Sequence, residues 1–495
     1  MPSFRVMPVD NLLAKKEGRA NRLRKVLGPL DLTALGLGAI IGTGIFVITG
    51  VAAARYAGPG LIISFIVAGL SSSLAALVYA ELAATVPVAG SAYTFTYISL
   101  GELLAWLVGW NLVLEYLVAA GAVSIGWSSY FVSLLQSAGI NLPLAFTASP
   151  AAGGIFNLPA VFITGLITIL IISGTQHSAA VNKIIVAGKV AVILLFIFLG
   201  VKHINPVNWQ PFLPFGVAGI FHGAAIIFFA FIGFDAVSTA AEEVKRPQRT
   251  LPLGILLSLG LSTFFYILVT IVLTGIVSYK VLDTASPMAA ALSAIGLRWG
   301  SALVATGALA GLTSVMLVTM YGQSRIFFAM SRDGLLPFLF SRLHPRFQTP
   351  LWNSLLIGTG VALIGALLPI NIVAELTNIG TLSAFFAVSI GLIILRRTRP
   401  DLPRPFRLPG YPATPLLAAG AAFYLAVNLP PLTWARFFIW VILGAILYFS
   451  YGYRHSALGQ ESTALKQVKK RPPLLFPAPL RKPGSKKSSP LKPDK

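Results

Sequence analysis

The stretch Gly38-Ala-Ile-Ile-Gly-Thr-Gly-Ile-Phe46 lies inside an apolar segment that runs from about residue 32 to residue 54. It places several glycines, which are poor helix formers, in the middle of a segment long enough to cross a membrane. A second apolar segment, at about 217–241, carries Phe228-Phe-Ala-Phe-Ile-Gly-Phe-Asp-Ala236 at a similar depth. A lone glycine in a membrane helix usually marks close helix packing. Here glycine lies beside polar residues in two separate apolar segments, which predicts instead that both helices unwind halfway across the bilayer.

The composition is that of a membrane protein. Of the 495 residues, 56% are hydrophobic and only 11% are charged, whereas soluble domains contain about 25% charged residues. The formal net charge of +22 does not indicate a nucleic-acid partner, because the basic residues lie in short loops and in both tails, as membrane topology requires. The chain has no cysteine, which excludes disulfides and thiolate metal sites, and we expect no metal and no cofactor.

Twelve apolar stretches are long enough to be membrane-spanning helices. They lie at about 32–54, 60–85, 103–135, 157–175, 182–201, 217–241, 253–277, 300–329, 353–369, 371–395, 414–430 and 436–453. An even number of spans places both termini on one side of the membrane. With the tails set aside, the loops on that side hold 12 basic residues and the opposite loops hold 5. Because basic loops face the cytoplasm, we expect cytoplasmic termini and a location in the plasma (inner) membrane.

The two interrupted stretches are the first and the sixth, so they cross the membrane in opposite directions. Two five-helix halves that each begin with a broken helix form an inverted repeat. We therefore predict an all-α polytopic membrane protein with two five-helix repeats and two additional helices. Its parts are a basic cytoplasmic N-terminal tail (1–30), the first repeat (31–201), the second, inverted repeat (217–395), the additional helices (414–453) and a disordered basic cytoplasmic tail (454–495). The last tail either contacts anionic lipid headgroups or only reinforces the orientation.

Irregular backbone within a bilayer is tolerated where it is buried in protein or lines a cavity. The free amides at the start of a half-helix suit a carboxylate, and free carbonyls suit an ammonium group. An amino acid zwitterion carries both groups. The two breaks therefore predict an amino acid transporter, with the alternative that the glycines only allow close packing.

Four motifs in order resemble the amino acid–polyamine–organocation superfamily, in its bacterial branch related to the cationic amino acid transporters. They are Gly38–Phe46, Pro87-Val-Ala-Gly-Ser-Ala-Tyr93, Gly233-Phe-Asp-Ala-Val-Ser-Thr-Ala-Ala-Glu-Glu243 and Ser331-Arg-Asp-Gly-Leu-Leu-Pro337. The resemblance covers about residues 25–455 and implies the inverted-repeat fold and transport by alternating access. By position, it implies that the substrate's amino and carboxylate groups contact the backbone of Ile40, Ile41, Gly42, Thr43, Gly44, Phe231, Ile232, Gly233 and Phe234. Phe231 resembles the aromatic residue that closes over the substrate, although a packing or lipid-facing role is the alternative.

Two ionisable residues within predicted spans are candidates for proton coupling, because a charge inside the membrane is costly and usually functional. Lys189 lies seven residues into its span. The resemblance implies that this lysine replaces a sodium site and contacts carbonyls near Gly42 and hydroxyls such as that of Ser314. The alternative is a lysine that reaches the headgroups. Glu115 lies deep in the third span and either transfers protons or balances a buried cation.

The remaining polar residues of the spans have less specific roles. We expect Asp235 to cap the second half of its helix or to contact substrate, and we expect structural roles for Glu81 and Glu375. Arg325 and Arg332 are expected to act in a gate or to anchor a loop.

The resemblance implies that Thr319 forms the floor of the substrate pocket, where a small residue leaves room for a long side chain. Packing is the alternative role. Apart from Glu115, no carboxylate is placed to pair with a guanidinium. We therefore predict neutral or broad-range amino acid substrates, with lysine and arginine left open.

Other classes of protein fit the sequence poorly. An intramembrane aspartyl protease needs paired membrane aspartates, and only Asp235 lies in a predicted span. A channel would show repeated rings of identical groups, and this sequence has none. The chain is thus expected not to be an enzyme, and sodium-coupled transport is the main competing mechanism. Its expected partners are the amino acid substrate, protons and membrane lipids, and a small partner subunit stays open.

Overall fold

The computed structural model describes residues 5–8, 27–87, 91–173, 179–239, 244–284, 286–344 and 349–460. Every regular element in these ranges is helical, and one isolated parallel bridge joins Leu27 to Val244. The prediction of an all-α polytopic membrane protein is confirmed. Most of the two tails, the middle of the motif after Pro87 and the end of the motif at Glu243 lie outside the described residues.

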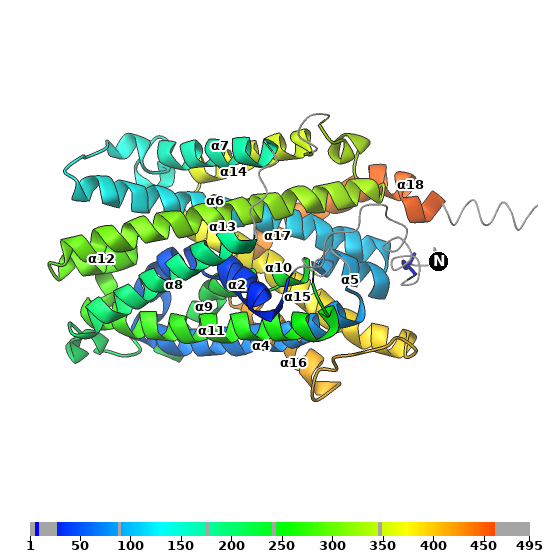
Figure 1. Cartoon of the computed structure of the whole chain (residues 1–495), viewed down its shortest axis with the longest axis horizontal. Coiled ribbons are helices and arrows are strands. Elements are labelled where there is room, and N and C mark those ends of the chain that lie inside the picture. The colour runs from blue at the N-terminus through cyan, green and yellow to red at the C-terminus, as the bar shows by residue number, and fades with distance from the viewer. Residues whose placement is uncertain are drawn as a thin grey trace, which may run out of the picture.

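The helices lie mostly lengthwise along one elongated bundle (Figure 1). They are α2 (Pro29–Ile40), α3 (Thr49–Ala52), α4 (Leu61–Thr85), α5 (Ser91–Ser99), α6 (Glu102–Ser137), α7 (Leu158–Ile172), α8 (Ala179–Val201), α9 (Gly216–Ile227), α10 (Ala236–Thr239), α11 (Pro247–Ile276), α12 (Pro287–Ala294), α13 (Arg298–Arg332), α14 (Leu351–Leu367), α15 (Ile370–Thr398), α16 (Ala413–Val427), α17 (Pro431–Leu447) and α18 (Tyr453–His455). The helix α6 packs along α13 and α15, and α7 and α14 lie side by side against it.

Seven helical stretches of the described chain are at least 18 residues long and apolar enough to cross a membrane. They are Gly44–Thr85, Glu102–Ser137, Lys183–Val201, Pro247–Ile276, Arg298–Arg332, Ile370–Thr398 and Pro431–His455. Five apolar helices are shorter, namely Pro29–Ile40, Leu158–Ile172, Gly216–Phe231, Leu351–Leu367 and Ala413–Val427. Each of the twelve predicted stretches overlaps one of these segments, and the number of spans stays a prediction.

The outer surface of the bundle is apolar in the way a lipid-facing surface is. Large hydrophobic side chains are more than half exposed on the outer helices, among them Phe162 on α7, Phe198 on α8, Leu417 on α16 and Ile439 on α17. Apolar exposure on this scale is rare on soluble proteins. Hydroxyl, amide and carboxylate side chains are instead buried between the helices.

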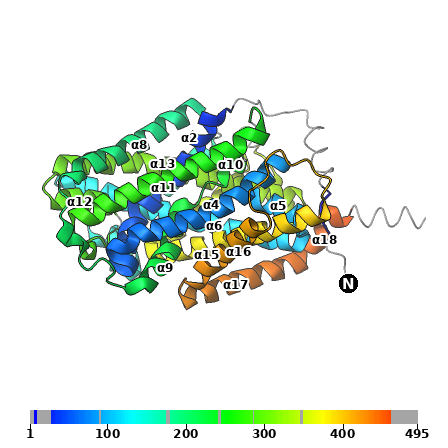
Figure 2. The same cartoon turned by 90° about the horizontal axis from the view of Figure 1, so that it is seen from below.

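Residues 5–8 and α18 lie at the same end of the bundle in both views, and α12 lies at the opposite end (Figures 1 and 2). The end of the bundle that holds residues 5–8 and α18 is called the termini end below. An even number of spans predicts this arrangement.

Both predicted interruptions are present, and each is shorter than the motif that contains it. The helix α2 continues to Ile40, and Ile41 is extended with φ −75° and ψ 97°. A π-helix, Gly44–Ile48, then leads into α3. In the second case α9 ends in a 3-10 turn, Phe228–Phe231, and is followed by an extended Ile232 and by Gly233 at φ +113°.

The two breaks pack directly against each other. A Cβ added at Gly44 would come within 2.2 Å of the Cα of Ala230, and one at Gly233 would come within 2.9 Å of the carbonyl carbon of Ala39. The glycines therefore serve close packing and unwinding together, and the two alternatives drawn from the sequence are not exclusive. Only glycine combines this approach with the positive φ at position 233.

Gly44→Ala is expected to lower the melting temperature of the purified protein by several degrees, because the added methyl group meets the backbone of Ala230. Overpacking of this kind costs about 1–3 kcal/mol. Gly165→Ala in α7 is the matched control, because a Cβ there meets nothing within 4 Å. Thermal unfolding in detergent measures both. Equal melting temperatures for the two variants would contradict the close contact.

Candidate functional site

One tyrosine hydroxyl joins the ends of the two broken helices. The Oη atom of Tyr266, on α11, lies 2.9 Å from the carbonyl oxygen of Ile40 and 2.9 Å from that of Ala230. The side chain is fully buried. A phenol has a single proton to donate, so it can satisfy only one of the two carbonyls at a time. The two carbonyls therefore share one proton at the point where the breaks meet.

Lys189 contacts the first broken helix from α8. Its ammonium nitrogen lies 2.7 Å from the carbonyl oxygen of Gly38, and only 1% of the residue is exposed. The aliphatic part of the side chain lies against Gly311 of α13. The lysine therefore points into the protein rather than towards a headgroup layer. The carbonyl that it contacts lies one turn before Gly42, the position named from the resemblance. The contact with the hydroxyl of Ser314, a buried residue of α13, stays a prediction.

The helical segment after the first break begins beside an unsatisfied hydroxyl. Ile40, Ile41, Gly42, Thr43 and Gly44 are all buried. Within the described chain, the hydroxyl oxygen of Thr43 is buried without a hydrogen-bond partner. Amides in the first turn of a helix lack partners within that helix. This segment therefore offers hydrogen-bonding groups that a bound molecule can use.

Thr319 reaches the same region from α13. Its hydroxyl donates to the carbonyl oxygen of Val315 at 2.8 Å, and the side chain is half-buried. The side chain of Val315 lies 3.1 Å from where a Cβ on Gly42 would stand. Thr319 thus lies one turn of α13 beyond the residue that contacts Gly42, and its hydroxyl is already satisfied.

Phe231 is fully buried in a cluster of aromatic rings. Its ring lies edge-on to Tyr266 at 5.5 Å between centroids and to Phe65 at 6.2 Å. Phe234, at the second break, packs against Phe385 of α15 and Tyr79 of α4. The second break is therefore surrounded by aromatic rings, and a closing movement of Phe231 stays a prediction.

The two carboxylates near the second break are both buried. Asp235 accepts a hydrogen bond from the hydroxyl of Ser91 on α5 at 3.3 Å, and its carbonyl accepts from the backbone of Ser238 at the start of α10. Glu115, on α6, faces Gly380 of α15 and lies within hydrogen-bonding reach of Thr381. The structure thus places Glu115 in the interior of the bundle.

Two further carboxylates of the spans, Glu81 and Glu375, have structural partners. Glu81 is fully buried and accepts hydrogen bonds from Arg396 at 2.7 and 2.5 Å and from the amide of Leu408 at 2.8 Å. Glu375 accepts from Thr433 at 2.7 Å. These contacts support the structural roles expected from the sequence.

Tyr266 and Asn378 were not predicted from the sequence. The amide nitrogen of Asn378 on α15 donates to the carbonyls of Ala225 and Ile226 at 2.8 and 2.9 Å, just before the second break. Both residues are polar side chains within strongly apolar stretches, and that signal was available. Neither residue is ionised at neutral pH, whereas the polar residues singled out within the spans were mainly ionisable.

A helical bundle with an apolar surface and two broken helices joined at its centre defines an integral membrane transport protein. Residues 27–449 match the sequence profile of the amino acid permease family, and the chain belongs to that family. This confirms the resemblance seen in the motifs, and the chain is a permease rather than an enzyme.

Several relatives are transporters. The chain is 48% identical over 462 residues to the branched-chain amino acid permease BcaP of Bacillus subtilis, covering 92% of this chain and 99% of that protein. It is 46% identical over 459 residues to the methylthioribose transporter of the same organism, with the same coverage of each chain. The vacuolar cationic amino acid transporter 4 of Arabidopsis thaliana is 37% identical over 401 residues, which cover 79% of this chain and 67% of that protein.

Tyr266→Phe is expected to raise the KM for amino acid uptake about tenfold, because the loss of one buried hydrogen bond releases the carbonyl ends of both breaks. Uptake into vesicles at graded substrate concentrations measures the KM. Tyr130→Phe is the control, because that buried hydroxyl donates to Phe46 alone, at 2.6 Å. A KM unchanged by Tyr266→Phe, or raised equally by both variants, would remove the special role of Tyr266.

Proposed function

We propose that this permease is a secondary active transporter that imports neutral L-amino acids with apolar side chains, held at the two breaks and exposed to each side of the membrane in turn. The observation that carries the proposal is the pair of carbonyls of Ile40 and Ala230 that share the single hydroxyl proton of Tyr266. The hydroxyl can donate to only one of these carbonyls at a time, and the ammonium group of an amino acid would supply a donor to the other.

The carboxylate of the substrate would contact the other side of the same break. The helical segment that starts near Thr43 begins with unpaired amides, and the positive end of a helix dipole favours a negative charge. The unpartnered hydroxyl of Thr43 adds a further donor. The backbone from Ile40 to Gly44 and from Phe231 to Phe234 thus supplies groups of both kinds over a short distance.

The surroundings of the second break favour an apolar substrate side chain. Phe228, Phe234 and Phe385 pack there edge to face or tilted, with centroids 5.1 and 5.7 Å apart. The high identity to a branched-chain amino acid permease points in the same direction. Leucine, isoleucine and valine are accordingly the proposed substrates. Glu115 is the group that would pair with arginine or lysine in the alternative of a cationic substrate.

Proton coupling is assigned to Lys189. When protonated, its ammonium holds the carbonyl of Gly38 and so fixes α2 in place. Loss of the proton weakens this bond and frees the first broken helix to move. Glu115 is a second candidate for proton transfer, and sodium is the competing coupling ion.

The proposed topology has twelve spans, arranged as two inverted five-helix repeats (31–201 and 217–395) followed by two additional helices (414–453). The common position of residues 5–8 and α18 at one end supports an even number of spans. The basic loops favour a cytoplasmic location for that end.

Competition for leucine uptake into reconstituted vesicles tests the substrate. Isoleucine and valine are expected to inhibit uptake strongly, and arginine weakly. Inhibition by arginine alone would replace the neutral assignment with the cationic one. Inhibition by methylthioribose alone, without inhibition by any amino acid, would refute binding of a zwitterion.

Lys189→Ala is expected to abolish the stimulation of uptake by an inwardly directed pH gradient, because the variant has no proton to exchange at the first broken helix. Leucine uptake with and without the pH gradient, and with a sodium gradient instead, measures this. Lys202→Ala removes an exposed lysine just after α8, the helix that carries Lys189, and is expected to keep the stimulation. If the Lys189→Ala protein still responded to the pH gradient, the coupling residue would lie elsewhere.

A further inference from the structure

Residues 5–8 form a short strap, here called the N-terminal strap, across the termini end of the bundle. The amide of Met7 donates to the carbonyl of Tyr97 at 3.3 Å, and the carbonyl of Arg5 accepts from the amide of Glu102 at 2.7 Å. The side chain of Met7 is buried. The strap therefore docks through backbone and side chain at the junction of α5 and α6.

One buried carboxylate, that of Glu102, links the strap to α5 and to the C-terminal part of the described chain. Glu102 is 1% exposed, and its oxygens accept from the hydroxyls of Tyr448 at 2.9 Å, Ser456 at 2.5 Å and Tyr97 at 3.3 Å. Arg5 supplies the positive charge, at 3.5 Å. A buried carboxylate is costly unless it is paired, so the loss of Arg5 weakens the whole cluster.

Arg5 also contacts the C-terminal part of the chain. Its guanidinium lies over the ring of Tyr453 at 4.5 Å from the centroid and donates to the carbonyl of that residue at 3.4 Å. The strap, α5, α6 and the α17–α18 region are thus joined at one point.

The helix α5 connects this point to the second break. Its first residue, Ser91, donates to Asp235 at 3.3 Å, and the hydroxyl of Tyr93 donates to Asp333 after α13 at 2.9 Å. Its last residues, Ile98 and Ser99, lie beside the strap. Residues 91–99 are all buried. A displacement of α5 at the strap would therefore also act on its contact with the second break.

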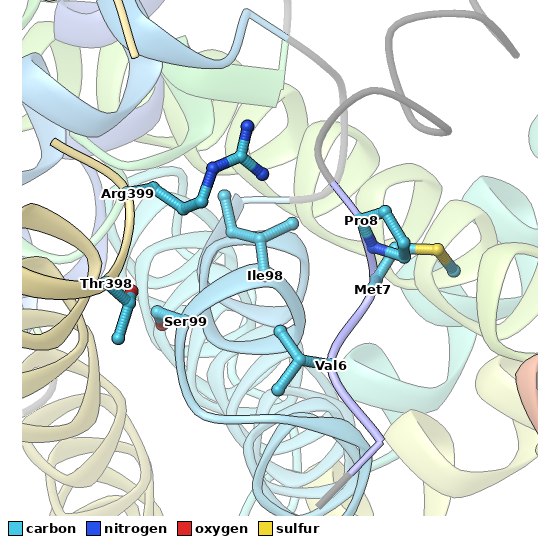
Figure 3. Close-up of a pocket in the computed structure, with 7 residues that line it drawn as sticks. All are labelled: Val6, Met7, Pro8, Ile98, Ser99, Thr398 and Arg399. Atoms are coloured by element: carbon cyan, nitrogen blue, oxygen red, sulfur yellow. The ribbon is translucent and has the colours of Figure 1, made fainter. Parts of the chain in front are cut away.

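A cavity of about 190 Å³ lies between the strap, the end of α5 and the end of α15 (Figure 3). Val6, Met7 and Pro8 line one side of it, and Ile98, Ser99, Thr398 and Arg399 line the others. The strap is thus held at a few points rather than packed along its length.

We propose that the N-terminal strap is a latch: it holds α5 against the second broken helix and keeps the transport path closed at the termini end. Release of the Arg5–Glu102 contact lets α5 move away from Asp235, and the site then opens on that side. The inference goes beyond the choice of substrate and coupling ion and requires only that the site opens to each side in turn.

A reversible cross-link tests the latch directly. The chain has no cysteine, so Val6→Cys with Ser99→Cys introduces a single pair of thiols on the same cavity. A bifunctional methanethiosulfonate reagent is expected to reduce leucine uptake at least tenfold in the double variant, and a reductant is expected to restore it. Each single variant, treated in the same way, should transport at its untreated rate. Full uptake by the cross-linked protein would overturn the proposal.

A second experiment releases the latch. With Ala92→Cys as a buried reporter on α5, Arg5→Ala is expected to raise the rate of labelling by an impermeant maleimide about tenfold from the termini side, the factor that one hydrogen bond to a charged group represents. Arg55→Ala is the matched control, because it removes an exposed arginine that pairs with Asp283 away from the strap. Arg5→Lys should restore slow labelling. Equal labelling rates with Arg5 and with alanine at this position would show that the strap is only a tether.

The two experiments separate the latch from the proposed substrate. Labelling of position 92 needs no substrate, so it reports on the latch even if leucine is not transported. If leucine uptake is absent from the parent protein, the labelling of position 92 alone decides whether the strap is a latch. Unchanged accessibility after Arg5→Ala would refute the latch on its own.

Discussion

The structure depends on the contact between two interrupted helices at the centre of the bundle. Backbone that leaves a helix within a bilayer must find other partners, because water is absent there and each unsatisfied group is costly. The breaks meet this requirement together. Gly44 and Gly233 let the two backbones approach closely, and Tyr266 supplies a proton to the buried carbonyls of Ile40 and Ala230. Each break therefore needs the other for the close backbone contact and for the shared hydroxyl of Tyr266.

Surrounding helices orient the groups at the breaks. Lys189 reaches the carbonyl of Gly38 from α8, and Asn378 reaches those of Ala225 and Ile226 from α15. In both cases a side chain on an unbroken helix holds a carbonyl of a broken one. Because these bonds are made in a buried, apolar region, each is worth more than the same bond at a surface. The arrangement holds the broken helices in place from the helices around them.

The sequence was most informative where local chemistry decides the structure. Glycine clusters within the apolar stretches predicted both breaks, although α2 continues further than the first motif suggests because Ala39 and Ile40 still favour a helix. The burial of Lys189 followed from its depth in its span. Tyr266, by contrast, gains its importance from two carbonyls that lie 226 and 36 residues away along the chain. A single sequence without its fold does not indicate such pairings, and the docking of residues 5–8 on Glu102 is of the same kind.

Among the described residues, the buried carboxylates that pair with an arginine lie near the termini end of the bundle. Glu81, with Arg396 and Leu408, and Glu102, with its hydroxyl partners, both lie near the termini end, whereas the ion pair of Arg55 with Asp283 is exposed to solvent. Separating buried ionic contacts costs more free energy than separating an exposed pair. In the proposed inverted repeat the two halves would be related by symmetry, and these contacts would make the two ends unequal in free energy. An empty carrier of this design is expected to rest with its gate on the termini side shut, ready to receive its cargo from the opposite face.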